Sequence, residues 1–585
     1  MLRTHTCGEL TSKEVNKDVT LSGWVHSRRD HGGVIFIDLR DRYGITQIVI
    51  NPDNEHFSEA DKLRREDVIQ VKGKVRHRPE GMTNPKILTG EIEVLVKHLI
   101  TLNKSESPPL EVEDRVIAGE DARLKYRYLD LRRPVMQKNL QLRHNLAQAA
   151  REYLNKHHFL EIETPLLIRA TPEGARDYVV PSRIHPGKIF ALPQSPQLYK
   201  QILMVSGCDR YYQLARCLRD EDLRADRQPE FTQIDVEMSF IEEEDIYEVV
   251  EGLIKHMLKK AADLDIATPF PRISYDEAID LYGVDKPDIR FNLHLHDITE
   301  IAKKADFNVF KQAELVKCIN PDKDFTRGEI EELTKIAQEF GAKGLAWVKV
   351  TSLGFEGGIA KFLENMQKDI IKKIGAKPGT TILFIADSKK ATNDILGGLR
   401  KYLGEKLNLY KKEELKFCWV TDFNLFEWDE EAQKWAPAHH IFTSPKPEHI
   451  QYLESDPAKV KGILYDLVLN GIELLSGSIR INRPDIQERV MAVIGLKKED
   501  AEKKFGFLLE AFRYGAPPHG GFAIGFDRLV ALLSGTNDIR EVIAFPKTKA
   551  TECPMDSCPT AWEDDQLKEL HIQLDPVAKK NITKQ

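Results

Sequence analysis

Alternating apolar and polar positions predict five short strands in the first hundred residues. A stretch with helical spacing, 55–66, separates the third strand from the fourth. This order is typical of an OB-fold, a small β-barrel whose face binds single-stranded nucleic acid by stacking and charge. We therefore expect a barrel over residues 1–105, with strands at 19–25, 34–39, 46–50, 68–75 and 91–96.

The predicted barrel carries the side chains that such a face needs. Arg28 and Arg29 end the first strand, Phe36 lies in the second and Gln47 in the third, and further cations follow on the fourth. An aromatic ring among cationic groups suits stacked bases and a phosphate backbone. The pattern alone leaves a second interpretation open, in which Phe36 belongs to the core and the cations are solvated.

Helical and extended patterns alternate after a break at 106–134. This segment contains Ser-Pro-Pro and a basic run with interleaved tyrosines, so it predicts a hinge that either contacts a nucleic-acid stem or forms a short linker helix. From 135 to 158 apolar residues recur at helical spacing, and an extended stretch closed by Pro165 follows. A second amphipathic helix is predicted over 242–264.

A strongly charged loop separates two predicted strands within 213–237. The ends of this stretch alternate apolar and polar residues, whereas its middle holds arginines among acids, and Phe231 follows on the return strand. Guanidinium groups bind phosphate oxygens in pairs, and an aromatic ring can support a flat base. The stretch therefore predicts a nucleotide site, against the alternative of a solvated hairpin loop.

The string Arg219-Asp-Glu…Arg227-Gln-Pro-Glu-Phe231 resembles the second signature motif of the class II aminoacyl-tRNA synthetases. With its surroundings it looks like the bacterial type of aspartyl-tRNA synthetase, and the resemblance extends over nearly the whole chain. It implies a multidomain α/β protein with an N-terminal OB-fold β-barrel, an antiparallel-sheet catalytic domain with helices, and an α+β insertion domain. The expected segments are the barrel (1–105), a hinge (106–134), two catalytic halves (135–290 and 413–555), the insertion domain (291–412) and a C-terminal extension (556–585).

The resemblance implies an ATP-dependent aspartate–tRNA ligase. L-aspartate and ATP would form aspartyl-adenylate and pyrophosphate, and tRNA would then take the aspartyl group and release AMP. The substrates supply both nucleophiles, so the protein contributes positioning and charge stabilisation. The related asparaginyl and lysyl enzymes share the barrel and the motifs, but the insertion and the pair Lys200 and Arg480 favour an acidic substrate. A non-catalytic relative is expected to lack Arg219, Glu473 or Arg528, and all three are present.

ATP and Mg²⁺ are the ligands that the resemblance assigns to the charged loop and to two later segments. Asp466 and Glu473 would hold Mg²⁺, although they stand seven residues apart on a strand run that Asn470-Gly471 interrupts. The family usually has glycines where this chain has Leu475-Ser476, which puts the local backbone geometry in question. The implied catalytic residues are Arg219, Glu473 and Arg528, and the implied ATP-binding residues are Arg219, Asp220, Glu221, Gln228, Phe231, Glu473, Gly525, Phe526, Asp527 and Arg528.

The resemblance also implies a pocket for the amino acid. Arg480 would pair with the side-chain carboxylate of aspartate, and a neutral amide would leave Arg480 and Lys200 without a charge partner. His439 and His440 are predicted on a strand, where neighbours point to opposite faces, so at most one would face the pocket. The implied aspartate-binding residues are Glu173, Gln197, Lys200, Arg219, His439 and Arg480.

The barrel is implied to bind the tRNA anticodon, with Phe36 stacked on a base and polar side chains on base edges. His31 and Gly81 lie near this face, where forms specific for tRNA(Asp) tend to have leucine and a lysine-like residue. Histidine and glycine resemble the relaxed form, which charges both tRNA(Asp) and tRNA(Asn). The alternative is strict specificity for tRNA(Asp), with neutral drift at both positions. The implied anticodon-binding residues are Arg29, Phe36, Gln47 and Glu93.

Composition suits a protein of the reducing cytoplasm. The seven cysteines are scattered and odd in number, no apolar signal region opens the chain, and no apolar run is long enough to cross a bilayer. Cys553 and Cys558 lie five apart, but no second pair of cysteines completes four zinc ligands, so no zinc site is predicted. The net charge of −7 leaves room only for local basic patches. The helix over 135–158 and the strand closed by Pro165 resemble the first class II motif, which implies a homodimer.

Overall fold

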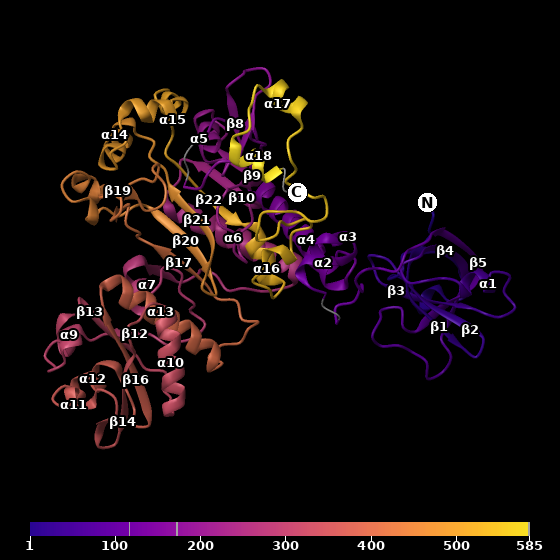
Figure 1. Ribbon diagram of the computed structural model, residues 1–585, viewed down its shortest axis with the longest axis horizontal. Coiled ribbons are helices and arrows are strands. Elements are labelled where there is room, and N and C mark those ends of the chain that lie inside the picture. The colour runs from indigo at the N-terminus through magenta and orange to yellow at the C-terminus, as the bar shows by residue number, and fades with distance from the viewer. Residues whose placement is uncertain (116–117, 171–173, 583–585) are drawn as a thin grey trace. The chain divides into compact units, whose positions relative to one another are not determined.

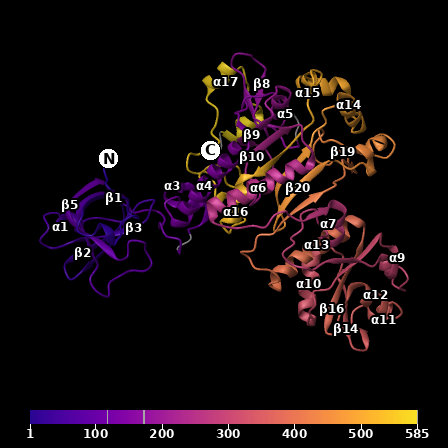
Figure 2. The same ribbon diagram turned by 180° about the vertical axis from the view of Figure 1, so that it is seen from behind.

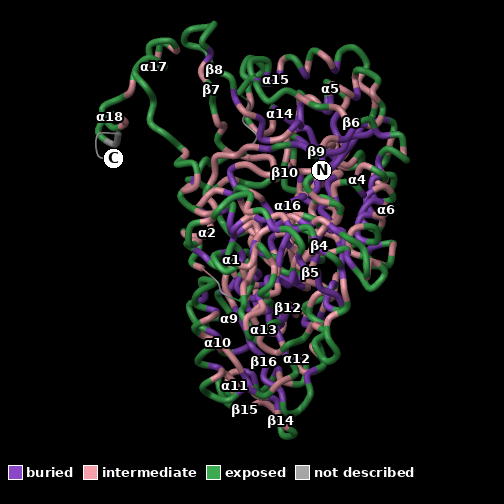
Figure 3. The backbone as a smooth tube through the Cα atoms, turned by 90° about the vertical axis from the view of Figure 1, so that its right-hand side faces the viewer, coloured by how far each residue is buried: buried purple, intermediate pink, exposed green. Residues whose placement is uncertain are grey.

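The computed structural model describes residues 1–115, 118–170 and 174–582, and the chain divides into two compact units. One unit contains Met1–Gln141 and Ile543–Thr560, and the other contains Leu142–Val542 and Ala561–Gln585. Within the described ranges, no helix is both long enough and apolar enough to cross a membrane. In Figure 3 the strands that fill the centres of the units are largely buried, whereas the C-terminal segment is largely exposed.

A closed five-stranded barrel forms most of the first unit, which confirms the OB-fold (Figure 1). Its interior is filled by inward-facing valine, leucine and isoleucine side chains. The helix predicted over 55–66 is shorter than expected and ends at Asp61, and the rest of the stretch forms a turn in which Glu66 has a φ of 68° and accepts from Arg40. The elements are η1 (Ser12–Glu14), β1 (Asp18–His31), β2 (Val34–Arg40), β3 (Ile45–Ile50), α1 (Phe57–Asp61), β4 (Val68–His77) and β5 (Ile92–Asn103), with β5 between β3 and β4 in the barrel.

The predicted hinge folds into two short helices around a buried carboxylate. Arg123, Arg127 and Arg133 all donate hydrogen bonds to Asp130, and Arg127 also donates to the Ala544 carbonyl. Burial raises the pKa of Asp130, but the guanidinium groups outweigh burial and hold the pKa below its usual value. These arginines therefore hold the fold together. The short helices agree with the linker-helix interpretation, whereas a contact with a nucleic-acid stem stays a prediction. The helices are α2 (Glu120–Lys125) and α3 (Arg127–Asp130).

An eight-stranded sheet forms the centre of the second unit, and all its pairings are antiparallel except the one at each edge (Figures 1 and 2). This confirms the antiparallel catalytic sheet. In order across the sheet, the strands are β11 (Arg272–Ser274), β17 (Phe417–Thr421), β20 (Leu464–Leu469), β21 (Ile472–Ile479), β22 (His519–Gly525), β10 (Glu230–Ser239), β9 (Arg210–Leu218) and β6 (Leu160–Glu161).

Helices and two small hairpins surround this sheet. α4 (Pro134–Lys156) follows the predicted helical pattern and leads into the short edge strand β6, and α6 (Glu243–Ala262) lies along the sheet in Figure 2. The hairpins are β7 (Val179–Pro181) with β8 (Ile189–Ala191) and β18 (Phe426–Asp429) with β19 (Lys434–Pro437). The remaining elements are α5 (Gln197–Val205), α7 (Tyr275–Tyr282), η2 (Pro447–Tyr452), η3 (Pro457–Lys459), α14 (Pro484–Val493), α15 (Lys498–Phe512), α16 (Phe526–Leu533), η4 (Ile539–Glu541), α17 (Asp564–Leu570) and α18 (Pro576–Ile582).

A second antiparallel sheet with helices on both faces forms the insertion, which confirms its α+β character. Each face has its own apolar core. The segment 358–373 holds two short helices, and Leu363 and Met366 at their junction both pack in one of these cores. The strands in sheet order are β12 (Leu295–Asp297), β13 (Leu315–Ile319), β16 (Thr380–Asp387), β14 (Ala346–Thr351) and β15 (Gly354–Glu356), and the helices are α8 (Thr299–Ala302), α9 (Asn308–Gln312), α10 (Arg327–Glu339), α11 (Ala360–Leu363), α12 (Gln367–Ile374) and α13 (Lys389–Lys406).

Candidate active site

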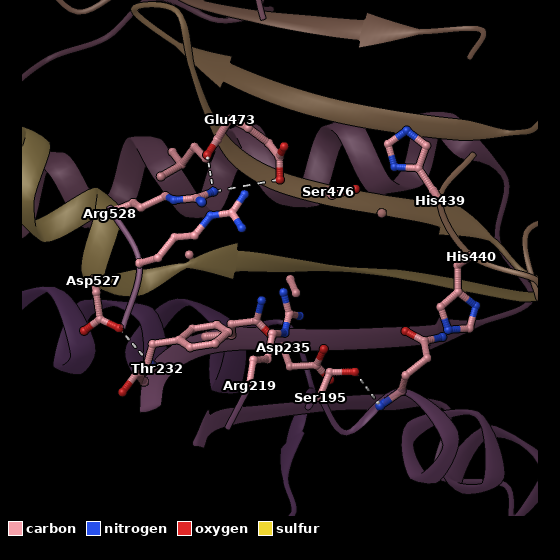
Figure 4. A pocket seen from close by; sticks show the side chains of 18 of the residues that line it. Ser195, Arg219, Thr232, Asp235, His439, His440, Glu473, Ser476, Asp527 and Arg528 are labelled. Carbon is pink, nitrogen blue, oxygen red and sulfur yellow. Dashed lines mark hydrogen bonds and ion pairs between the residues drawn. The ribbon is translucent and has the colours of Figure 1, made fainter. Parts of the chain in front are cut away.

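A pocket of about 420 Å³ opens on the large sheet, walled by α5, the loop between β9 and β10, and the start of α16 (Figure 4). It gathers residues from segments that are far apart in the sequence. Asp220, Asp466 and Phe526 are not among the described residues that line it, and Glu173 lies outside the described residues. The predicted residues that line the pocket are Gln197, Lys200, Arg219, Glu221, Gln228, Phe231, His439, Glu473, Arg480, Gly525, Asp527 and Arg528.

One end of the pocket is cationic, because the β9–β10 hairpin and α16 each contribute an arginine. The Arg219 guanidinium lies 5.1 Å from the centre of the Phe231 ring, and its Nε donates to the Gln194 carbonyl at 3.3 Å. Arg528 donates to the carbonyl of Glu473 and to Asp226, each at 3.2 Å. Within the described part of the chain, the terminal nitrogens of Arg219 make no hydrogen bond. They are therefore available to a phosphate group.

Asp527 and Phe526 support this end of the pocket. The Asp527 carboxylate accepts from the Arg143 guanidinium and from the Thr232 backbone amide, so its oxygens already have partners. The same guanidinium lies 4.8 Å from the centre of the Phe526 ring. Both residues fix the start of α16 against β10 and thereby position Arg528, whereas a direct contact of either with ATP stays a prediction.

The other end of the pocket contains two cations and two buried carboxylates. Lys200 lies 2.8 Å from Asp235 and 3.1 Å from Glu237, and Arg480 forms two hydrogen bonds with Glu237 at 2.9 and 3.2 Å. Asp235 and Glu237 are two apart on β10, so they share one face of the sheet. Sequence reasoning missed both acids, because their partners come from α5 and from the residue after β21.

Two buried polar atoms at this end have no hydrogen-bond partner among the described residues. They are Oδ2 of Asp235, an acceptor, and Nε2 of Gln197, a donor. Burial raises the pKa of Asp235 to about 6, although the Lys200 ammonium opposes that shift. Because an unpaired buried polar atom is costly, these atoms are suited to bind a polar ligand.

His439 and His440 both line the pocket, so the expectation that only one would do so is wrong. They lie in a bend after β19 rather than on a strand, and the alternation of a strand does not apply to them. Burial and the nearby Arg480 lower the pKa of His440 to about 3, so this ring is neutral. Its Nδ1 accepts from the Phe442 amide. Burial also lowers the pKa of His439.

A bulge between β20 and β21 brings Asp466 and Glu473 to one face of the sheet. Glu473 pairs with Val468, two residues along from Asp466, because the register shifts by one residue at Leu467. Both oxygens of Asp466 are buried without a hydrogen-bond partner in the described ranges. Burial and the neighbouring Glu473 raise the pKa of Asp466. An unpartnered carboxylate beside a second one fits a bound divalent cation.

Leu475-Ser476 leaves the strand intact, which answers the question about local geometry. Leu475 packs in the core and Ser476 lines the pocket within a continuous β21. A further pocket residue, Lys286, lies 2.7 Å from Glu473. Burial raises the pKa of Glu473, but the Lys286 ammonium outweighs burial and lowers it. No local motif marks Lys286, so the sequence did not indicate it.

Three of the predicted anticodon residues, Arg29, Gln47 and Glu93, belong to one network on the barrel. Arg29 donates to Asp38 and, at 3.4 Å, to Gln47, and Gln47 donates to the buried Glu93 at 2.8 Å. Arg76 donates to the other oxygen of Glu93. Three further predicted residues lie on this unit. Phe36 is half-buried, and the centres of its ring and the His31 ring lie 6.2 Å apart in an edge-on arrangement. Gly81 has a φ of 77°, and a Cβ atom added there would meet no other atom within 4 Å.

A family model described as tRNA synthetases class II (D, K and N) matches residues 119–549, most of the chain. The chain belongs to the class II tRNA synthetases. A second model, described as OB-fold nucleic acid binding domain, matches residues 19–102 of this synthetase. The two matches cover the catalytic sheet and the barrel respectively.

Relatives of this synthetase are similar over almost their whole length. An aspartate–tRNA(Asp/Asn) ligase of Caldanaerobacter subterraneus subsp. tengcongensis is 52% identical over 582 residues, which is 98% of each chain. An aspartate–tRNA ligase of Macrococcus caseolyticus is 50% identical, again over 98% of each chain. Among solved structures, the asparaginyl-tRNA synthetase of Pyrococcus horikoshii complexed with asparaginyl-adenylate has a TM-score of 0.60 and 23% identity, covering 94% of this chain and 99% of that one. The last comparison shows the fold alone.

Proposed function

We propose that this synthetase attaches L-aspartate to tRNA in two steps, through an aspartyl-adenylate made from ATP. The arrangement of Arg480 carries the proposal. Its five N–H groups include two that Glu237 accepts and one that Ser478 accepts at 2.6 Å. One N–H remains on each terminal nitrogen. A pair of parallel donors of this kind suits the side-chain carboxylate of aspartate.

Asparagine would be rejected by its hydrogen-bond donors. The expectation that an amide leaves Lys200 and Arg480 without charge partners is wrong, because Asp235 and Glu237 already pair with them. An amide nitrogen would instead bring N–H groups against the remaining donors of Arg480. That mismatch leaves buried donors unsatisfied, which is the basis of strong rejection in a polar site.

The rest of the pocket supports the first step. The unpaired Oδ2 of Asp235 can accept from the ammonium group of aspartate, while the free donors of Arg219 bind the α-phosphate and Arg528 binds the terminal phosphate. The α-carboxylate then attacks the α-phosphorus, and pyrophosphate leaves. Asp466 and Glu473 would hold Mg²⁺, which neutralises phosphate charge when bound. In the second step the terminal ribose hydroxyl of tRNA attacks the acyl carbon and AMP leaves.

Aspartate binding should weaken as the pH falls through about 6, because protonation of Asp235 removes the acceptor for the ammonium group. The groups around Asp235 are Lys200, Glu237, Arg480 and Tyr211. Since the pKa is raised, the carboxylate is ionised above about 6 and neutral below it. Equilibrium dialysis with labelled aspartate and no ATP should show an affinity loss approaching tenfold per pH unit below that value. An affinity that is unchanged from pH 8 to pH 5 would contradict this role.

We propose that both tRNA(Asp) and tRNA(Asn) are substrates. One relative is named an aspartate–tRNA(Asp/Asn) ligase and another an aspartate–tRNA ligase, and their identities to this chain are 52% and 50%. Overall similarity therefore does not separate the relaxed form from the strict one. The positions of His31 and Gly81 support the relaxed form. His31 lies beside Phe36, the residue expected to stack on an anticodon base, and the anticodons for aspartate and asparagine differ at one base.

His31→Leu should shift charging toward tRNA(Asp), because leucine removes the polar ring beside the discriminating base. Gly81→Lys is a poorer test, since lysine would be strained at a φ of 77°. Initial rates of aspartylation on the two purified tRNAs measure the preference. The relaxed form is rejected by a wild-type preference for tRNA(Asp) above about a hundredfold, about 2.7 kcal/mol, or by an unchanged preference in the variant.

A homodimer in the cytoplasm completes the proposal. Three leucines that follow α4 are each more than half exposed: Leu160, Leu166 and Leu167. An exposed apolar group of this kind supports a contact with a second subunit. All seven cysteines lie in described ranges and none forms a disulfide, which supports a reducing compartment. Light scattering of the purified protein should give twice the chain mass.

A further inference from the structure

Two cysteines and an aspartate meet in one turn near the end of the first unit. The sulfur atoms of Cys553 and Cys558 and a carboxylate oxygen of Asp556 all lie within 4.8 Å of one another. The backbone holds the two cysteines together, because the Cys553 amide donates to the Cys558 carbonyl at 2.8 Å. The Cys558 amide donates to Asp556 at 3.2 Å. The sequence pointed to the two cysteines but predicted no zinc site, because it did not reveal Asp556 as a third group beside them.

The geometry is close to that of a tetrahedral zinc site. With bonds of about 2.3 Å to sulfur and 2.0 Å to oxygen, zinc ligands lie about 3.8 Å apart for two sulfurs and about 3.5 Å for sulfur and oxygen. The two sulfurs therefore need to approach by about 1 Å at most, and each sulfur and the oxygen by about 1.3 Å at most. The spacing Cys-x4-Cys also falls within the range of zinc ligands that share a turn.

The surroundings of these three groups suit a metal ion that keeps one coordination position open to solvent. Cys553 is 5% exposed, whereas Cys558 is half-buried and Asp556 is exposed, so one ligand is shielded and the others are accessible from solvent. Two thiolates favour zinc over magnesium or calcium. Hydrogen bonds from Cys553 and Cys558 lower the pKa of Asp556, and the nearby Lys547 ammonium adds to that effect. The positive charge of Lys547 would offset the net negative charge of zinc with three anionic ligands.

We propose that Cys553, Asp556 and Cys558 bind one Zn²⁺ ion, with water as the fourth ligand. Binding converts two thiols to thiolates and releases two protons to solvent, while the carboxylate is already ionised. The ion would close the turn between residues 553 and 558 and stiffen the segment whose Ala544 carbonyl accepts from Arg127. No step of tRNA charging passes through it.

Cobalt titration of the reduced, metal-free, full-length protein tests the site directly. We expect one equivalent of Co²⁺ to give the near-ultraviolet thiolate-to-cobalt band of a tetrahedral site, and Zn²⁺ to remove that band. Cys553→Ser and Cys558→Ser should lose the band, and Asp556→Asn should weaken Zn²⁺ binding at least about tenfold. Cys208→Ser, a half-buried cysteine elsewhere, should keep it. A cobalt spectrum without a sulfur band would assign the ion to Glu55, His56 and His98, the other suitable group in the described ranges, and would overturn the proposal.

Alkylation of the wild-type protein keeps the test independent of how the variants fold. Iodoacetamide should label Cys558 at least about tenfold more slowly with Zn²⁺ than without it, because a coordinated thiolate is a poor nucleophile. Equal labelling overturns the proposal. So does a disulfide between Cys553 and Cys558 in protein purified under reducing conditions, since that bond would use both sulfur ligands.

Discussion

Arg219→Ala is expected to slow aspartate-dependent ATP–pyrophosphate exchange by about 10²–10³-fold, or about 3–4 kcal/mol. The terminal nitrogens of this guanidinium have no hydrogen bond within the described residues, and Arg219 lines the pocket in which the α-phosphate is proposed to react. Charge develops on that phosphate during adenylate formation, so a positioned cation stabilises the transition state more than the ground state.

Arg216→Ala is the matched control for Arg219→Ala. Arg216 lies on β9, the strand that leads to Arg219, pairs with Glu230 at 2.8 Å on the surface, and is not among the residues that line the pocket. Its exchange rate should stay within about threefold of wild type, since an exposed ion pair is worth about 1 kcal/mol at most. Exchange by Arg219→Ala at a rate close to that of Arg216→Ala would refute the assignment.

Arg480→Leu is expected to lower kcat/KM for aspartate by about 10³-fold or more, with little change in the KM for ATP. Arg480 is 5% exposed and would meet only the side-chain carboxylate of aspartate, at the end of the pocket opposite Arg528. Its removal also leaves Glu237 paired with Lys200 alone among the described cations, and losing one member of a buried pair costs about 3–5 kcal/mol of stability.

Two further variants distinguish the effect of Arg480→Leu on aspartate binding from its effect on stability. Arg480→Leu combined with Glu237→Gln removes the stranded charge, so it should recover thermal stability and still fail to activate aspartate. Arg483→Leu changes an exposed arginine three residues away, paired with Asp485, and should behave as wild type. Parallel losses in the KM for ATP and for aspartate would contradict the role given to Arg480.

Elements with one buried face could be predicted from the sequence. The barrel strands alternate because their inward residues fill the core, and α4 and α6 follow their apolar spacing for the same reason. Where a long-range contact decides the backbone, the pattern failed. α1 covers only part of the predicted stretch, and the stretch ends in a turn where the Glu66 carboxylate accepts from Arg40, a residue 26 positions earlier.

The candidate site shows the same limit. Its arginines belong to recognisable motifs, but Arg480 and Glu237 are 243 residues apart, so no local pattern could reveal that Arg480 already has a partner. The spacing of Asp466 and Glu473, interrupted at Asn470-Gly471, left their relative orientation open, and the bulge of the hairpin decides it. Asp556 became a candidate ligand only when the turn placed its carboxylate beside two sulfur atoms.

Charging of unfractionated tRNA with labelled amino acids tests the central claim most directly. The purified protein, supplied with ATP and Mg²⁺, should transfer aspartate to acid-precipitable tRNA and should transfer neither asparagine nor lysine, the other amino acids that this branch of class II synthetases uses. Failure to form aspartyl-tRNA, or formation of asparaginyl- or lysyl-tRNA at a comparable rate, would contradict the account.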